Sequence, residues 1–351
     1  MFALGRQPNT DTLHAAAHEL TPAVERACRT ALPSTHSPMK AWIGATLAIL
    51  ALSACGSASS PTAPSAPPIA PPAPAPITIT GRVTATNGGQ ALAGLSAELG
   101  PSTVATDGAG AFTTQLPPTP TLRLALTGSA IVPRTLTVAA TASRELAVTA
   151  IAVGGAFDLG FYRQFVRDAN ESATLQPLRR WTAAPNLFLQ TSALADPPTL
   201  DMIERVAREI VPVWTNGAFG LAAVERGEGT RENQPGWLTV RWSAETAQCG
   251  LSDVAKSGGV ITLFPNRPTC PCGGYKIAPA LVRHEFGHAL GFYHTDATSD
   301  VMNTRGLQCD QQPSARERYH AAIAYQRPVG NVDPDTDPIG TVTLAPLRAI
   351  P

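Results

Sequence analysis

The chain has 351 residues, of which 44% are hydrophobic and 15% are charged. Its 26 basic side chains balance 26 acidic ones, so the composition gives no support for electrostatic binding to nucleic acid or to an acidic membrane surface. A chain of this length has room for two domains beside an export signal.

An export signal is predicted over residues 39–55. Met39-Lys40 is a short positive start, and residues 41–52 are an apolar run too short to span a bilayer. The ending Leu-Ser-Ala-Cys resembles the lipobox of bacterial lipoproteins, which implies that Cys55 is lipidated and becomes the mature N-terminus. We interpret residues 1–38 as an upstream artefact. The alternatives are a genuine long leader, or a membrane helix in which Cys55 is only a small apolar residue.

Residues 56–76 are predicted to form a tether. They consist mainly of Ser, Ala, Thr and Pro, and eight prolines lie between Pro61 and Pro76. Such a sequence cannot bury a core and favours extended polyproline conformations of about 3.1 Å per residue. Together with the lipidated cysteine, it predicts an exported protein held at the cell envelope by a lipid anchor, at the outer membrane or the cell surface.

Residues 77–151 are predicted to form a small all-β domain. Apolar residues alternate with polar ones in several short segments, and clusters such as Asn87-Gly88-Gly89 mark the turns between them. About seven short strands indicate a β-sandwich. The segments 81–83 and 106–112 resemble the regulatory, transthyretin-like sandwich found beside many secreted peptidases. The domain has no cluster of titratable side chains, so we expect it to act as a spacer or a binding module.

Residues 155–327 mix helical and strand patterns. Apolar residues recur at helical spacing from Leu200 to Ile210, and we expect that helix to end at Pro212. Strands are predicted at 186–190, 237–242 and 260–264. A further helix is expected to begin near Pro279, since proline suits a first turn.

The segment from His284 to His294 reads H-E-F-G-H-A-L-G-F-Y-H. His284 and His288 are four residues apart, so a helix presents both imidazoles on one face. Gly291 can take the left-handed conformation that ends a helix and turns the chain back, which lets His294 join them. Three nitrogen ligands with a fourth position open to water are the arrangement of a catalytic Zn²⁺. Glu285 is placed to touch that water without binding the metal.

This segment resembles the metzincin zinc peptidases, because their motif H-E-x-x-H-x-x-G-x-x-H is matched at every fixed position. Met302 lies eight residues after His294, as in the matrixin-like members. The resemblance implies an α+β zincin domain in which Glu285 is the general base and Met302 supports the site from below. It also implies an edge strand that pairs with extended substrate, for which 260–264 is the candidate.

After the methionine turn, Ser314 and Glu317 form a capping box that opens a helix stopped by Pro328. His320 lies on that helix and is expected to be a packing or surface residue. Asp296 is expected either to fix the loop after the third ligand or to be an ordinary turn residue. Residues 328–351 are expected to form a proline-spaced, partly ordered tail.

Four cysteines lie in residues 155–327, namely Cys249, Cys270, Cys272 and Cys309. An even number in an exported protein indicates two disulfides. A bridge between Cys270 and Cys272 would be strained, so each is expected to pair with one of the other two. The alternative is a second metal site, which would need more soft ligands nearby than the sequence shows.

The sequence therefore predicts a multidomain chain, a small all-β sandwich followed by an α+β metzincin-like catalytic domain. The predicted function is that of a monomeric, lipid-anchored zinc endopeptidase acting on a protein or peptide substrate. One alternative is a zinc hydrolase that acts on a non-protein amide. The other is a non-catalytic surface binding protein built on a peptidase fold.

Overall fold

The computed structural model describes residues 73–340. These residues form a mixed α/β structure with three β-sheets and belong to one compact unit. The predicted signal, Cys55 and most of the predicted tether lie outside the described residues. Within residues 73–340, none of the helices has the length and apolar character needed to cross a membrane.

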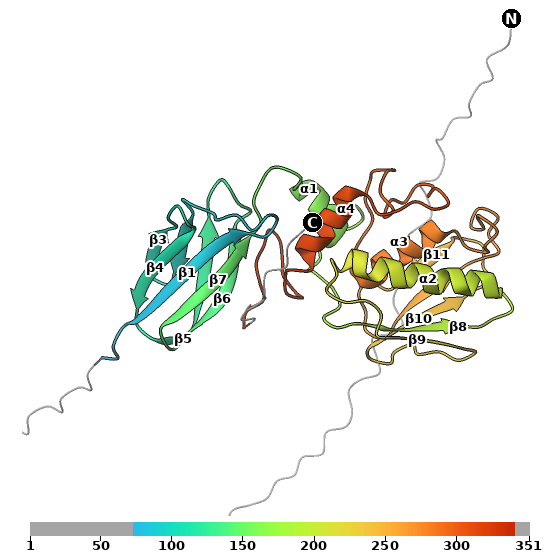
Figure 1. Cartoon of the computed structure of the whole chain (residues 1–351), viewed down its shortest axis with the longest axis horizontal. Helices are drawn as coiled ribbons and strands as arrows, with labels where there is room; N and C mark the ends of the chain where they lie inside the picture. The colour runs from blue at the N-terminus through green and yellow to red at the C-terminus, as the bar shows by residue number, and fades with distance from the viewer. Residues whose placement is uncertain (1–72, 341–351) are drawn as a thin grey trace, which may run out of the picture. The chain divides into compact units, whose positions relative to one another are not determined.

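The first seven strands form two sheets, which Figure 1 shows in blue to green. Their bounds are β1 Ile77–Ala85, β2 Ser96–Leu99, β3 Ser102–Ala105, β4 Ala111–Leu116, β5 Thr119–Thr127, β6 Arg134–Ala140 and β7 Arg144–Ala150. One sheet has the order β4-β1-β7 and the other β3-β2-β5-β6. Their buried side chains belong to a single hydrophobic cluster, because alternate residues of strands such as β1 and β6 point inward. We call residues 77–150 the β region.

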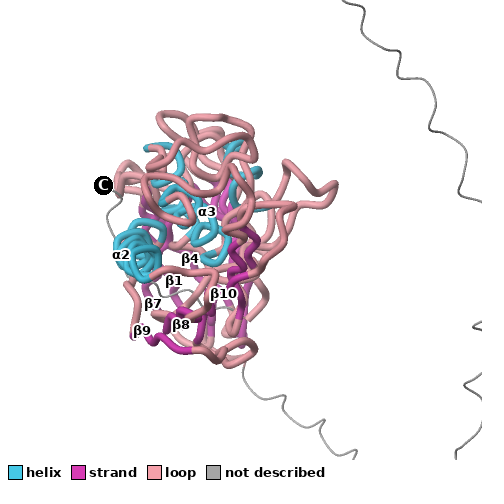
Figure 2. The backbone as a smooth tube through the Cα atoms, turned by 90° about the vertical axis from the view of Figure 1, so that its right-hand side faces the viewer, coloured by secondary structure: helices cyan, strands magenta, loops and turns pink. Residues whose placement is uncertain are grey.

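The remaining strands form one five-stranded sheet of order β11-β12-β10-β8-β9. Their bounds are β8 Asn186–Gln190, β9 Ala223–Gly227, β10 Trp237–Trp242, β11 Gly250–Ser252 and β12 Gly259–Leu263. All neighbours in this sheet are parallel except β11, which runs antiparallel to β12. Helices α2 (Pro197–Trp214) and α3 (Pro279–Leu290) lie along one face of the sheet, as Figures 1 and 2 show.

The edge strand beside α3 is β11, so the expectation that 260–264 forms this edge is wrong. Strand β12 pairs with β10 on one side and with β11 on the other. All five of its residues are buried. Burial of every residue is the mark of an interior strand covered on both faces, whereas an edge strand exposes part of its surface.

Helix α2 continues through Pro212 to Trp214, so the expectation that Pro212 ends it is also wrong. A proline in a helix removes one backbone hydrogen bond. Here the proline lies in the last turn of the helix. The helix continues for two more residues, and the last of them, Trp214, is fully buried in the core. Burying an indole ring stabilises the folded state by more free energy than one backbone hydrogen bond does.

The two remaining helices are α1 (Leu159–Arg167) and α4 (Ala315–Ala324). Helix α4 begins with the predicted capping box, in which Ser314 and Glu317 each bond the other's backbone N–H. His320 on α4 is fully buried. Its Nδ1 donates to the carbonyl of Arg316 and its Nε2 accepts the N–H of Asp158, so it is a packing residue.

Within the segment expected to be a partly ordered tail, several of residues 328–340 are buried. Arg134 of β6 donates to Asp335 at 2.8 Å and to Asp337 at 2.7 Å, and all three side chains are at most 2% exposed. Arg327 also bonds Asp335, and Asn331 bonds both carboxylates. Burial alone would raise the pKa of Asp335, but Arg134 and Arg327 lower it below its usual range. This buried cluster ties the segment to the β region.

Candidate metal centre

Helix α3 carries the first two candidate ligands. It begins at Pro279, directly after Ala278, and ends at Gly291, which has a φ of 116°. A methyl group at Gly291 would also collide with the carbonyl oxygen of Arg179. Glycine is therefore required here for its backbone conformation and for the close approach of a neighbouring segment.

The turn at Gly291 brings the three predicted histidines together. The Nε2 atom of His288 lies 3.1 Å from that of His284 and 3.1 Å from that of His294. The Nε2 atoms of His284 and His294 are 3.2 Å apart. Zinc–nitrogen bonds of about 2.0–2.1 Å at tetrahedral angles put two ligand nitrogens about 3.3 Å apart. The spacing of the three nitrogens fits a zinc ion.

The other nitrogen of each ring shows which tautomer is present. Nδ1 of His284 bonds the carbonyl of Val301 at 2.7 Å, and Nδ1 of His288 bonds that of Phe292 at 2.8 Å. Nδ1 of His294 bonds the carboxylate of Glu171 at 2.6 Å. Carbonyl and carboxylate oxygens only accept, so each Nδ1 carries the proton and each Nε2 presents a lone pair.

Three Nε2 lone pairs therefore meet at one point. The short contacts between them are not hydrogen bonds in this tautomer, because no Nε2 carries a proton to donate. Burial lowers the pKa of His284 to about 4 and that of His288 well below its usual value. Both rings are thus neutral at pH 7, which is the form that binds metal. The arrangement calls for a cation.

Glu285 follows the first ligand on α3 and is 3% exposed. Its Oε2 is buried with no hydrogen-bond partner, which is unusual for a carboxyl group in a folded protein. Burial raises the pKa of Glu285 to about 8. A divalent cation beside it would offset that cost. The orphaned carboxyl and the three lone pairs are two separate features of a site that could hold a metal ion.

The edge strand β11 lies against this carboxyl group. A methyl group at Gly250 would collide with the side chain of Glu285. Cys249, the preceding residue, is tied by a disulfide to Cys270. The disulfide thus holds β11 beside Glu285, and Gly250 leaves the space that the Glu285 side chain fills.

Met302, in the turn after the third histidine, is fully buried. Its sulfur packs against Gly287 of α3, where any side chain would collide with it. The backbone N–H groups of Val301 and Met302 donate to the two carboxylate oxygens of Glu317 at 3.1 and 2.8 Å. Glu317 therefore holds the peptide whose carbonyl orients His284.

The loop between His294 and Met302 is fixed by Asp300. This fully buried carboxylate accepts hydrogen bonds from the hydroxyls of Thr295 and Ser314 and pairs with Arg316. Asp296, which the sequence offered as one way to fix this loop, is exposed and accepts a hydrogen bond from Gln164 at 3.3 Å. Of the two readings of Asp296, the ordinary turn residue describes it better.

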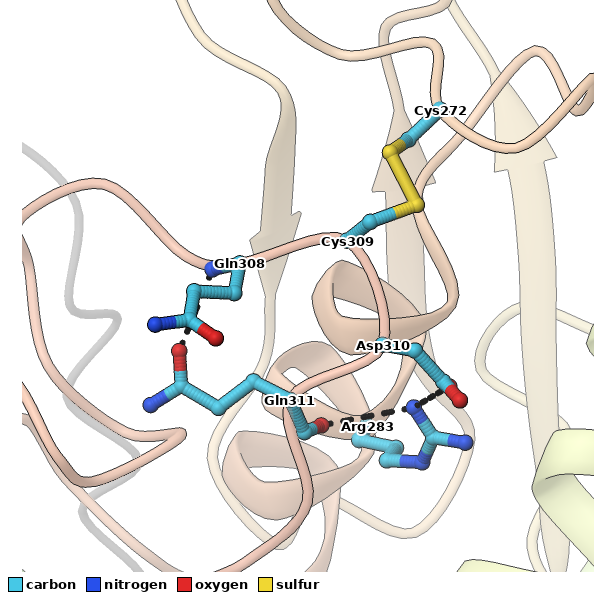
Figure 3. Close-up of a disulfide and its surroundings, with 6 residues drawn as sticks. All are labelled: Cys272, Arg283, Gln308, Cys309, Asp310 and Gln311. Atoms are coloured by element: carbon cyan, nitrogen blue, oxygen red, sulfur yellow. Dashed lines mark hydrogen bonds and ion pairs between the residues drawn. A yellow bond between two sulfur atoms is a disulfide. The ribbon is translucent and has the colours of Figure 1, made fainter.

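The four cysteines form the disulfides Cys249–Cys270 and Cys272–Cys309, consistent with the expected pairing. Figure 3 shows the second bridge and the residues around it. Arg283, next to the first ligand, donates to the carboxylate of Asp310 at 2.7 Å. The bridge and this ion pair together hold the segment after the methionine turn against α3.

Five residues of the site were not assigned to it from the sequence: Glu171, Gly250, Gly287, Asp300 and Glu317 in its contact with the methionine turn. Glu317 was predicted only as a helix cap. Gly287 stands at a variable position of the motif, and its small size is the one signal that could have pointed to the methionine packed against it.

No protein-family model matches the chain, and no curated protein matches it. Solved structures similar to it include high choriolytic enzyme 1, a hatching-enzyme zinc protease from the medaka Oryzias latipes. The identity is 13%, the match covers 43% of this chain and 99% of the enzyme, and the TM-score is 0.27. Metalloproteinase-II from Bacteroides fragilis is 10% identical over 72% of this chain and 92% of its own, with a TM-score of 0.29.

A third similar structure is a type II cohesin–X-dockerin complex from Acetivibrio cellulolyticus. It is 20% identical over 23% of this chain, with a TM-score of 0.20, and the chain spans 61% of its length. Likenesses at this level carry no argument about what the present chain does. The candidate metal centre is defined by the chain's own residues.

Proposed function

We propose that the chain is a zinc endopeptidase whose metal is held by His284, His288 and His294. The observation that carries the proposal is the convergence of three unprotonated Nε2 atoms beside the buried, unpartnered carboxyl of Glu285. Three imidazoles and no thiolate or carboxylate ligand leave a coordination position for substrate or water, as in catalytic zinc sites.

Each residue has a distinct role in the proposed reaction. Bound at the three histidines, zinc supplies Lewis-acid polarisation of an attacking water and of a substrate carbonyl. Glu285 takes a proton from the water as it attacks the scissile carbonyl and returns that proton to the leaving amine. Burial raises the pKa of Glu285 to about 8, and the charge of a nearby cation opposes that rise, which keeps the basic carboxylate form available at neutral pH.

The substrate is an extended stretch of protein or peptide that pairs with β11. Strand β11 is bonded to β12 on one side and is the last strand of its sheet. Its free backbone groups can therefore add a strand from another chain. Leu251 in the middle of β11 is 56% exposed, and Gly250 lies against Glu285. A peptide paired there would pass beside the general base.

The decisive experiment measures zinc content and cleavage of a peptide library by the full chain and by three variants. Glu285→Ala should keep zinc and lose about 10²–10⁴-fold in rate, because it removes only the general base. His294→Ala should lose zinc and activity together. Glu209→Gln on α2, half-exposed and paired with Arg205, serves as the control and should match the parent.

Cleavage by Glu285→Ala at the parent rate would contradict this mechanism. Stoichiometric zinc without cleavage of any library peptide would favour a hydrolase for a non-protein amide. Zinc-free parent protein would leave only the non-catalytic alternative.

We propose further that the protein is exported and anchored through a lipid on Cys55. The two disulfides support export, because such bonds persist in oxidising compartments. A chain that begins at Met39 should incorporate labelled fatty acid and sediment with membranes, and Cys55→Ala should abolish both. Peptides from residues 1–38 in the mature protein would contradict the predicted start.

We also propose that the protein is a monomer. Size-exclusion chromatography of the delipidated protein checks this.

A further inference from the structure

The third histidine differs from the other two in how it is held. His284 and His288 lie on α3 and are 7% and 9% exposed, whereas His294 lies beyond the helix and its side chain is 24% exposed. The first two rings donate Nδ1–H to backbone carbonyls. Only His294 donates to a charged side chain, the carboxylate of Glu171, at 2.6 Å. The most exposed of the three ligands thus has the strongest hydrogen-bond acceptor.

The loop that carries Glu171 is folded back onto the end of α1. Asp168 ends the helix in the left-handed conformation, with a φ of 60°. The N–H of Ser172 donates to the carbonyl of Asp168, and that of Gln176 donates to the carbonyl of Arg167, both at 2.9 Å. The Glu171 backbone therefore lies in a short bonded loop with a defined position relative to α1.

The same helix end also holds the segment that leads to His294. The N–H of Tyr293 donates to the carbonyl of Phe165 at 2.8 Å. The rings of Phe165 and Phe292 stack with centroids 4.3 Å apart, and both are buried. Helix α1 consequently fixes both partners of the Glu171–His294 bond.

We propose that Glu171 is a positioning residue for the third metal ligand. The proposal rests on the zinc site proposed above. The carboxylate keeps the proton of His294 on Nδ1 and sets the plane of the ring, so that the Nε2 lone pair faces the other two histidines. Its negative charge also makes the imidazole a stronger donor toward a cation. Such partners typically contribute 10–100-fold to metal affinity.

The test compares the zinc affinity of the full chain with that of Glu171→Ala, Glu171→Gln and the control Glu209→Gln. Glu209 is also a half-exposed glutamate with a charged partner, and it lies on α2. Affinity is measured by competition with a chromophoric chelator, and ligand geometry by the visible absorption spectrum of the Co²⁺-substituted protein. Neither readout depends on knowing a substrate.

Glu171→Ala should bind zinc about 10–100-fold more weakly and shift the Co²⁺ absorption bands. Glu171→Gln should lose less, because the amide oxygen can still accept the Nδ1 proton but carries no charge. The control should match the parent. Glu171 is half-exposed, so melting temperatures close to the parent value are expected and show that the variants are folded.

Parent-like affinity and an unchanged Co²⁺ spectrum in both Glu171 variants, with zinc lost from His294→Ala, would overturn the role of Glu171 and leave the zinc site standing. Absence of zinc binding by the parent itself would overturn the proposed function and this role with it.

Discussion

The proximity of β11 to Glu285 leads to a prediction about Gly250. The φ of Gly250 is one that alanine can adopt, so the substitution Gly250→Ala does not strain the backbone. The added methyl group would lie 2.5 Å from Cδ and 2.8 Å from Cγ of Glu285. Ordinary carbon contacts are about 3.5–4.0 Å, so the carboxyl end of Glu285 must move by on the order of 1 Å.

That movement should affect the rate much more than the stability. The obstructing atoms are the far end of a flexible side chain, which can shift without disturbing the core. A reacting group misplaced by about 1 Å can cost about 10²-fold in rate, equivalent to about 2.7 kcal/mol of barrier. Zinc content should stay at the parent level, because the three ligands are untouched.

The assay is kcat/KM on a peptide selected from the library, together with zinc content and melting temperature. Gly220→Ala is the matched control, because Gly220 has an ordinary φ and open space where the methyl group would lie. Shortening the base should relieve the collision, so Glu285→Asp should cost less in the Gly250→Ala chain than in the parent. Parent-like kcat/KM in Gly250→Ala would refute the steric reasoning.

Three further predictions concern the support of the site and of the fold. Met302→Leu keeps an apolar side chain against Gly287 and should cost at most about 1.5 kcal/mol in chemical denaturation, with zinc retained; loss of zinc would show that the sulfur itself matters. Removal of zinc with a chelator should lower the melting temperature, and added zinc should restore it, since a ligand bound to the folded state stabilises it. Asp335→Asn leaves Arg134 and Arg327 without their shared charge and should cost about 3–5 kcal/mol at pH 7. The folded-state pKa of Asp335 is below the unfolded value of about 3.9, so this stabilisation is present above about pH 4 and is lost as the pH falls through the folded pKa. A difference in unfolding free energy between parent and variant that persists at low pH would contradict this prediction.

The parts of the site that the sequence could predict depend on local rules. The spacing of His284 and His288 on one helix, the left-handed turn at Gly291 and the cap at Ser314 are all set by residues within a few positions of one another. The structure has each of these features. Local geometry of this kind follows from helix periodicity and from the conformational range of glycine.

Contacts between distant segments could not be predicted in this way. Glu171 lies 123 residues before His294, on an exposed loop with no periodic pattern around it. The position of β12 inside the sheet depends on its pairing with β10 and β11, and the sequence of its five residues does not show which strands will pair with it. Glu317 has a clear local role as a cap, and that role conceals the second one, its bonds to the methionine turn.

The buried cluster around Arg134 has a consequence for the order in which the chain is made. Its partners Asp335 and Asp337 follow it by 201 and 203 residues, so they leave the ribosome, and any export channel, long after β6. Until then the guanidinium group has no carboxylate to neutralise it, and burying it alone is costly. Until residues 335–337 have been made, the guanidinium is better left in water, and its burial awaits these partners. The contact between the β region and residues 335–337 is therefore among the last that the described part of the chain can make as it is synthesised.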